Sequence, residues 1–181
     1  MFKVMLCAFL LVLLSPLFAV IGVLIVLTSG RPILFTQQRL GVHRIPFTIY
    51  KFRTMTNGHI TRMGRFLRAT GIDELPQLWN IAKNDMAFVG PRPLTQADVS
   101  RLGWLGTHYD VRWSVRPGIT GLAQLSHGCH RKRTWCHDRY YAMQRSHCLD
   151  MKIIIRSAAV PFVGKHWGKR IWRLITNQGS K

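Results

Sequence analysis

Acidic residues are scarce in this 181-residue chain, which has seven Asp and Glu against 26 Lys and Arg and a formal net charge of +19. A surface with this balance attracts anions such as nucleic acid, the negatively charged cytoplasmic leaflet of a membrane, or substrates rich in phosphate. Asp73 and Glu74 are the only adjacent acidic pair, and Glu74 is the only glutamate. The pair is therefore the first candidate for a reaction centre.

Cysteine is also sparse, since four cysteines in a chain of this length do not make a disulfide scaffold. A reducing, cytosolic setting fits them best. Two of the four lie in a Cys- and His-containing stretch from His127 to His137, but the six-residue gap between Cys129 and Cys136 is not the spacing of a zinc clip. A plain polar loop is the simpler interpretation of this stretch.

Several nucleotide-binding and hydrolytic signatures are missing. The chain has no Gly-rich Walker sequence, no dinucleotide-binding fingerprint and no Ser-His-Asp signature. The common alternatives for an enzyme that uses nucleotides are therefore excluded.

Charge is absent altogether from Val4 to Leu27, a segment that is nearly all apolar. At about 1.5 Å per residue, a helix of this length crosses a hydrocarbon core of about 30 Å, so the segment predicts membrane association. Pro16 lacks a backbone donor and predicts a kink or a helix-break-helix, and the Ser15 hydroxyl can satisfy a freed carbonyl. The residues alone leave two arrangements open: a kinked spanning helix, which the physics favours, and a hairpin that re-enters the same leaflet.

The body that follows carries nearly all of the basic residues, which places it on the cytoplasmic side of a membrane. Short extended pieces at Pro32–Phe35 and Phe47–Phe52 predict a small hairpin. An amphipathic basic helix is predicted over Ile60–Ala69, and a further helix over Tyr140–Ile155. A turn followed by acids and Pro76 predicts that another helix starts at the acidic pair.

Adjacent carboxylates at a helix start have two interpretations. They can be a helix cap with a dipole-favoured glutamate, which is common, or they can hold a divalent metal and offer one oxygen as a nucleophile. Nearby cations favour the second interpretation, because arginine forks suit the oxygens of a diphosphate. The basic residues close to Gly, Pro or helix-end signals are Lys51, Arg53, Arg68, Arg92, Arg112 and Arg116. A carboxylate attacks an anionic phosphoryl group only when cations neutralise the charge, so the acids, the arginines and Mg²⁺ form one mechanistic set.

Seven short motifs follow one another in order along the chain. They are Leu14–Leu17, Tyr50–Met55, Gly64–Arg68, Asp73–Asn80, Asp85–Met86, Val89–Pro93 and Pro117–Gly121. Together they resemble the bacterial sugar transferases called small monotopic phosphoglycosyl transferases, over a stretch from about Leu14 to Ile155.

The resemblance implies a helix-rich α/β fold in two parts. Residues 1–30 would form a re-entrant membrane helix broken at Ser15 and Pro16, which reverses the preference for a spanning helix. Residues 31–181 would form a compact, membrane-associated catalytic body with amphipathic interfacial helices. The expected location is the bacterial inner (cytoplasmic) membrane, with the body on the cytoplasmic face.

The resemblance also implies a reaction. Asp73 would attack the β-phosphorus of a nucleotide diphosphosugar, a UDP-sugar being the expected type, and release a nucleoside monophosphate. Polyprenol (undecaprenyl) phosphate would then collect the phosphosugar, as the first membrane step of exopolysaccharide, lipopolysaccharide O-antigen or glycoprotein assembly. Glu74 would be the metal-associated carboxylate, with Asp73 and Glu74 as the Mg²⁺ ligands. The expected phosphate-binding residues are Lys51, Arg53, Arg68, Arg92, Arg116 and Arg131.

The chain departs from the family pattern in two places. The basic pair and Asp that usually precede the membrane helix are missing, with only Lys3 near that region. An Asn-Gly-Arg-Asn-like loop is replaced by Ser126–Arg131, so the sugar cannot be read from it. The resemblance leaves open whether the chain forms a homodimer.

Two other classes of function compete with this interpretation. A membrane-anchored nucleic-acid binder would suit the charge, but the chain has no recognisable nucleic-acid-binding module, so no nucleic acid is expected as a partner. A noncatalytic scaffold would tolerate loss of either acid, and the presence of both Asp73 and Glu74 argues against it.

Overall fold

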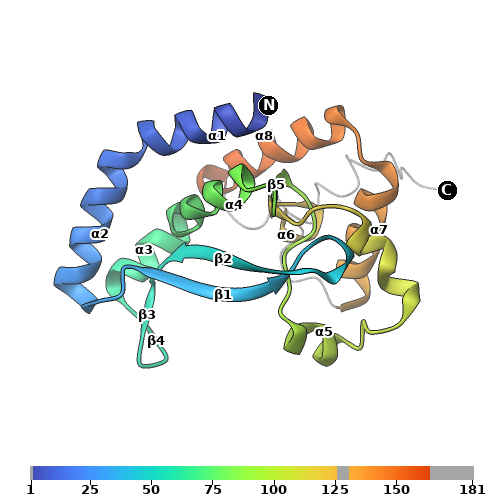
Figure 1. The fold of residues 1–181 in the computed structure, drawn as a ribbon, viewed down its shortest axis with the longest axis horizontal. Helices are drawn as coiled ribbons and strands as arrows, with labels where there is room; N and C mark the ends of the chain where they lie inside the picture. The colour runs from blue at the N-terminus through green and yellow to red at the C-terminus, as the bar shows by residue number, and fades with distance from the viewer. Residues whose placement is uncertain (1, 126–130, 164–181) are drawn as a thin grey trace. The chain divides into compact units, whose positions relative to one another are not determined.

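The computed structural model describes residues 2–125 and 131–163 of the chain (Figure 1). It divides into two compact units, each of which is described by itself. Unit 1 comprises Met1–Gln38 and Phe47–Met86, and unit 2 comprises Arg39–Pro46 and Ala87–Lys181. A domain boundary at residue 30 stays a prediction. The apolar helices end beside it, at Ser29.

Unit 1 begins with two helices, α1 (Phe2–Leu13) and α2 (Ser15–Ser29), that meet at an angle of 55° (Figure 1). Pro16 lies in the first turn of α2 and has no N–H to donate to Val12, four residues earlier. The Ser15 hydroxyl donates to that carbonyl oxygen at 2.7 Å, as expected from the sequence. In the described chain no single helix is long and apolar enough to cross a membrane, whereas α1 and α2 together meet that length and composition.

Many large apolar side chains of α1 and α2 are exposed. They are Val4, Met5, Phe9, Val12, Leu13, Leu17, Val20, Val23, Leu24 and Leu27. Other positions of α2 pack inward, where Ile21 and Ile25 form a core cluster with Phe52 and Leu67. The two helices therefore present one apolar surface to the body and a second one outward.

The predicted hairpin is present, but its first strand starts at Leu34 rather than Pro32 and ends at Leu40 rather than Phe35, and its turn belongs to unit 2. Strand β1 spans Leu34–Leu40 and pairs with β2 (Pro46–Phe52) in a two-stranded sheet. The predicted helix at Ile60 is wrong in its start, because α3 begins at Arg62 and ends at Thr70. Ile60 instead belongs to β4 (His59–Ile60), which pairs antiparallel with β3 (Met55–Thr56). The Thr61 side chain accepts the Gly64 N–H at 2.9 Å and so caps α3.

A short 3₁₀ helix and a short α-helix complete unit 1. The 3₁₀ helix η2 spans Ile72–Gln77, and α4 spans Leu78–Ala82. Helix α1 packs along α4, and Lys3 Nζ donates to the Met86 carbonyl oxygen at 2.9 Å. The acidic pair thus lies on η2, between two elements that are packed against the apolar helices.

Unit 2 contains a parallel strand pair together with several helical elements. Strand β5 (Ala87–Val89) pairs with β6 (Gly118–Thr120). The helical elements are η1 (Val42–Arg44), α5 (Gln96–Leu102), η3 (Thr107–Ser114), α6 (Leu122–Leu125), α7 (Arg131–Gln144) and α8 (His147–Val163). The single helix predicted over Tyr140–Ile155 is wrong, because α7 ends at Gln144 and the Ser146 hydroxyl accepts the Leu149 N–H at 3.2 Å to start a new helix.

The interior of unit 2 holds a buried ion pair. Arg112 Nε donates to Asp138 Oδ2 at 2.7 Å, and the two side chains are 2% and 3% exposed. The Arg112 guanidinium also lies over the rings of Trp113 and Trp104, at 4.7 and 5.6 Å from their centroids. The sequence grouped Arg112 with the cations near Gly, Pro or helix-end signals but not with the expected phosphate-binding residues, and in the structure Asp138 and two indoles enclose it.

Removing either partner of this pair should destabilise unit 2, because an uncompensated charge would stay buried. Arg112→Met and Asp138→Asn should each lower the free energy of unfolding by about 3–5 kcal/mol in denaturant titrations. Arg112→Met combined with Asp138→Leu should recover much of this loss, since both buried charges are then gone.

A matched control is Arg101→Met, which removes an exposed pair between Arg101 and Asp98. Its effect should stay within about 1 kcal/mol. An equally small effect of Arg112→Met would contradict the assignment of Arg112 to the core.

Candidate active site

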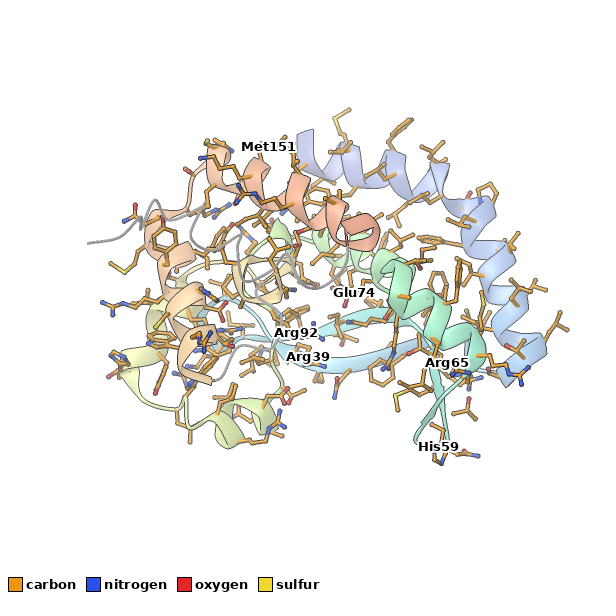
Figure 2. All side chains as sticks on the ribbon, turned by 180° about the vertical axis from the view of Figure 1, so that it is seen from behind. Arg39, His59, Arg65, Glu74, Arg92 and Met151 are labelled. Atoms are coloured by element: carbon orange, nitrogen blue, oxygen red, sulfur yellow. The ribbon has the colours of Figure 1, made fainter. Side chains whose placement is uncertain are left out.

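The acidic pair is held by the backbone of η2. Gly71 ends α3 with φ of 75°, a left-handed conformation that a residue with a side chain seldom adopts. The chain then turns into η2, where the Glu74 N–H donates to the Gly71 carbonyl oxygen at 3.1 Å. Asp73 is 8% exposed, and the Glu74 side chain is 24% exposed. Both acids therefore sit at the edge of the interior rather than on an open surface, and Figure 2 marks Glu74.

Lys51 reaches the pair from the neighbouring strand. It lies on β2, and its Nζ donates to Glu74 Oε1 at 2.5 Å. The Lys51 side chain is 17% exposed, so solvent screens this ion pair less than it screens a surface pair. The structure thus brings together Lys51 and Glu74, two residues that the sequence placed in the site.

Asn80, which was not predicted as a site residue, fixes the strand that carries Lys51. Its side-chain Oδ1 accepts the Tyr50 N–H at 3.2 Å, and its Nδ2 donates to the Thr48 carbonyl oxygen at 2.6 Å. The amide therefore pairs with β2 as a neighbouring strand would, although it comes from α4. Asn80 is fully buried. In the sequence, Asn80 is the last residue of the motif that begins at Asp73 and lies between the apolar Trp79 and Ile81.

Arg68 approaches Asp73 from the end of α3. Its Nε donates to Thr54 Oγ1 at 2.8 Å, and its positive charge acts on the Asp73 carboxyl. Within the described chain the two terminal guanidinium nitrogens of Arg68 make no hydrogen bond. These nitrogens can therefore receive an anionic oxygen of a ligand.

Gly64 allows α3 to come this close. A Cβ added at Gly64 would lie 2.1 Å from the Thr54 carbonyl oxygen, which is too close for any side chain. The helix and the Thr54 backbone thus touch directly, and this contact sets the reach of Arg68.

The surroundings raise the pKa of the Asp73 carboxyl above its usual range. Burial is the main cause, and the negative charge of Glu74 adds to it. The positive charges of Lys51 and Arg68 act in the opposite direction and do not cancel these effects. The ionised Asp73 is thus poorly solvated and has a like charge beside it.

Arg53 is engaged elsewhere in unit 1. Its Nη1 donates to the Arg31 carbonyl oxygen at 2.6 Å, and its Nη2 donates to the carbonyl oxygens of Ser29 and Gly30. The guanidinium therefore covers the carboxyl-terminal end of α2, where the helix dipole favours a cation. A role of Arg53 in phosphate binding stays a prediction.

Arg92 and Arg116 belong to unit 2, where they come from two adjoining turns. The Gly118 N–H donates to the Pro91 carbonyl oxygen at 3.0 Å, and the Gly90 N–H donates to that of Thr120 at 2.9 Å. The Arg92 side chain is exposed and that of Arg116 is half-buried.

Two other arginines hold the backbone of the Arg92 turn. Arg39, a residue that the sequence did not single out, donates through Nη1 to the Pro93 carbonyl oxygen at 3.1 Å (Figure 2). Arg112 Nη2 donates to the carbonyl oxygen of Arg92 itself. The turn is thus rigid while its guanidinium stays exposed.

The structure says less about Arg131 and the Cys- and His-containing stretch. Arg131 is the first residue of α7, and its side chain lies outside the described part of the structure, as do residues 126–130 with His127, Cys129 and His130. Cys136 is exposed and unpaired, whereas His137 is buried, and burial lowers its pKa. Among the described residues, no three His, Cys, Asp or Glu side chains gather in a way that holds a metal.

Asp73 and Glu74 nevertheless fit a magnesium ion that is shared with a substrate. Mg²⁺ is usually bound by one or two carboxylates together with substrate phosphates and waters, and these two side chains offer the oxygen ligands it prefers. Lys51 occupies one oxygen of Glu74 and leaves Oε2 for an ion. The raised pKa of Asp73 agrees with a site where negative charge is not fully compensated.

The family model that matches this chain and three of its relatives are all described as sugar or sugar-phosphate transferases or as exopolysaccharide production proteins. The sequence profile of a family described as bacterial sugar transferase matches residues 1–164. The chain is 36% identical over 171 residues to a UDP-N-acetylgalactosamine-undecaprenyl-phosphate N-acetylgalactosaminephosphotransferase of Aeromonas hydrophila, covering 84% of this chain and 40% of that protein. It is 34% identical over 176 residues to a UDP-glucose:undecaprenyl-phosphate glucose-1-phosphate transferase of Klebsiella pneumoniae, covering 86% and 38%.

A third relative is similar in length. The chain is 34% identical over 171 residues to the exopolysaccharide production protein PSS of Rhizobium leguminosarum bv. phaseoli, covering 80% of this chain and 84% of that protein. The chain therefore spans about two fifths of the length of the first two relatives and most of the third.

The raised pKa of Asp73 predicts how stability changes with pH. Because the folded-state pKa lies above the unfolded value of about 3.9, ionisation of Asp73 destabilises the fold progressively as the pH rises above about 4. In metal-free buffer, Asp73→Asn should therefore melt at a higher temperature than the wild type at pH 7, and the difference should shrink toward pH 4.

Asp98→Asn is the matched control with the opposite sign. Burial alone would raise the pKa of Asp98, but hydrogen bonds from Thr95 and the charges of Arg39 and Arg101 outweigh burial and lower it. Asp98→Asn should melt below the wild type at pH 7, and this deficit should disappear only as the pH falls below about 4. An Asp73→Asn variant that is less stable than the wild type at pH 7 would refute the proposed environment of Asp73.

Proposed function

The chain belongs to the bacterial sugar transferase family, and on this premise we propose that it transfers a phosphosugar from a UDP-sugar to polyprenol phosphate and releases UMP. The names of two relatives support this proposal, since each mentions a UDP-sugar and undecaprenyl phosphate. The main observation behind it is the cluster on unit 1, in which the charges of Lys51 and Arg68 act on the buried Asp73 and Lys51 is paired with the half-buried Glu74.

The proposed reaction has two steps. An Asp73 carboxylate oxygen attacks the β-phosphorus of the UDP-sugar, so that an acyl phosphate bond forms and the bond from that phosphorus to the oxygen bridging the two phosphates breaks. The electron pair leaves with the bridging oxygen as UMP. A phosphate oxygen of the polyprenol phosphate then attacks the same phosphorus, which regenerates the Asp73 carboxylate and yields a polyprenyl diphosphate sugar.

The surroundings of Asp73 suit a nucleophile. A carboxylate that is 8% exposed has lost most of its hydration, and weak solvation leaves its oxygens reactive. Glu74 cannot take the same role as easily, because Lys51 Nζ holds one of its oxygens at 2.5 Å. Glu74 instead orients Lys51 and supplies an oxygen for Mg²⁺. Bound Mg²⁺ would neutralise the diphosphate charge that otherwise repels the acidic pair.

The arginines take different shares in binding phosphate. Arg68 is the best placed, because its terminal nitrogens are unengaged in the described chain and its charge acts on Asp73. Arg92 and Arg116 belong to unit 2, where Arg92 presents an exposed guanidinium on a braced turn, and their part in phosphate binding stays a prediction from the sequence. Arg53 and Arg131 complete the proposed set.

The proposed location is the bacterial inner membrane, with the body on the cytoplasmic face. The exposed apolar side chains of α1 and α2 support it, as does the net charge of +19, which suits an anionic leaflet. The 55° bend at Leu14 supports a hairpin that re-enters one leaflet. In that setting the chain would act at the start of exopolysaccharide or related glycoconjugate assembly.

The assignment of the nucleophile predicts a covalent adduct. Purified wild-type protein given a UDP-sugar with labelled sugar, without polyprenol phosphate, should release UMP and retain the phosphosugar on Asp73. Asp73→Asn should form no adduct and lose about 10³-fold or more in turnover. Glu74→Gln should still form the adduct but slow turnover by roughly 10²–10⁴-fold.

Intact-mass analysis and peptide mapping measure the adduct directly. Asp110→Asn is the matched control, because Asp110 is exposed and pairs with Arg44 in unit 2, away from the acidic pair in sequence. This variant should behave as the wild type. An adduct that survives in Asp73→Asn, or maps to another residue, would show that the nucleophile is wrongly chosen.

The proposed magnesium ion predicts a second result. Exhaustive chelation should abolish UMP release, and added Mg²⁺ should restore it, because two carboxylates and a diphosphate repel one another without a counter-charge. Turnover that persists after chelation would exclude a metal-dependent reaction. Titration of Mg²⁺ against Glu74→Gln should show a higher requirement than in the wild type, as one ligand is lost.

A further inference from the structure

Gln77 is a buried amide that the proposed mechanism does not use. It is the last residue of η2 and is only 1% exposed. Its Nε2 makes no hydrogen bond within the described part of the chain. Most buried polar side-chain atoms in native proteins are paired, so an orphaned NH₂ group of this kind calls for an explanation.

Asn80 gives a direct comparison from the same motif. It lies three residues further along and is equally buried, yet both atoms of its side-chain amide are bonded to β2. Burial of an amide in this region is thus compatible with full hydrogen bonding. The lack of a hydrogen bond at Gln77 Nε2 therefore depends on the position of Gln77 and is not shared by the other buried amide of the Asp73–Asn80 motif.

Gln77 follows the acidic pair along the same short helix, three residues after Glu74. A 3₁₀ helix has three residues per turn, so side chains three residues apart lie above one another on the same face. Gln77 therefore lies on the face of η2 that carries Glu74, one turn further on. A basic residue in place of Gln77 would be attracted to the carboxylates, as Lys51 is attracted to Glu74. The amide of Gln77 carries no charge, and its Nε2 makes no hydrogen bond to either carboxylate in the described chain.

We infer that Gln77 Nε2 is a hydrogen-bond donor held for an anionic phosphoryl oxygen of the substrate at the acidic pair. The inference rests on the proposed function and adds a substrate-contacting residue to it. A phosphoryl oxygen that arrives beside Asp73 supplies the acceptor that Nε2 lacks. In a site with little water, such a preorganised neutral donor stabilises developing negative charge without adding to the cationic charge of the protein.

The inference predicts different effects of a Gln77 substitution on stability and on activity. Gln77→Met has nearly the same length and no polar atom, so it removes an unsatisfied buried group and should melt at the same temperature as the wild type or higher. The same variant should lower kcat/KM for UMP release from a UDP-sugar by about 10²-fold. A residue with a purely structural role would show the reverse pattern.

Asn80→Leu is the matched control for stability. It replaces an amide that has both partners, and it should lower the melting temperature because the Tyr50 N–H and the Thr48 carbonyl then lose their bonds. A fall in the melting temperature of Gln77→Met of the same size as that of Asn80→Leu would overturn the inference, since Nε2 would then have a structural partner.

A binding readout keeps this result distinct from the proposed function. Inorganic pyrophosphate, in the presence of Mg²⁺, should raise the melting temperature of the wild type, and the shift should be smaller for Gln77→Met. If the wild type releases no UMP from any UDP-sugar but shows this difference, the transferase proposal fails and the donor role stands. If Gln77→Met matches the wild type in both pyrophosphate binding and UMP release, the donor role is refuted.

Discussion

The ion pair between Lys51 and Glu74 is the interaction on which the candidate site depends. It joins β2 to η2 at 2.5 Å, and neither side chain is more than 24% exposed. Two adjacent carboxylates near the interior repel each other, and without a close cation this arrangement would favour protonation or unfolding. Lys51 compensates one of the two charges. Asp73 is left buried beside this ion pair, and its pKa is raised.

The rest of unit 1 can be understood as support for this pair. Asn80 fixes the strand that carries Lys51, and Gly64 lets α3 approach Thr54 so that Arg68 reaches toward Asp73. Supporting side chains of this kind lock the geometry of a reaction centre, because small displacements of charged groups change their interaction strongly. In unit 1, neutral and small residues thus position the charged side chains around the acidic pair.

The arginines of this very basic chain fall into two groups that composition cannot separate. Arg53 and Arg112 are bound by carbonyl oxygens or enclosed by Asp138 and two indoles, and Arg39 braces the Arg92 turn. Arg68 and Arg92 instead keep exposed guanidinium groups. The distinction follows from which carbonyls and carboxylates lie nearby after folding. For this reason the sequence could not show that Arg112 is buried, and the phosphate-binding role expected of Arg53 stays a prediction.

The sequence by itself determined the features that depend on residues close in the chain. The break at Ser15 and Pro16, the strand ending at Phe52 and a helical element at the acidic pair, which starts one residue earlier at Ile72, follow from local backbone chemistry. The ordered motifs pointed to the family. Only the tertiary structure decided which distant groups meet, because the contacts of Lys51 with Glu74, of Asn80 with β2 and of Arg112 with Asp138 join residues 23 to 32 positions apart. Helix boundaries depended on both local sequence and contacts made after folding. Ile60 is apolar and fits a helix by its sequence, yet it pairs in a strand, so the helix starts after it. Ser146 is neutral and also fits a helix, yet it caps a new helix that starts after it. Burial of Gln77 without a partner was likewise invisible in the sequence, since it depends on what packs around η2 and not on the residues that precede and follow it.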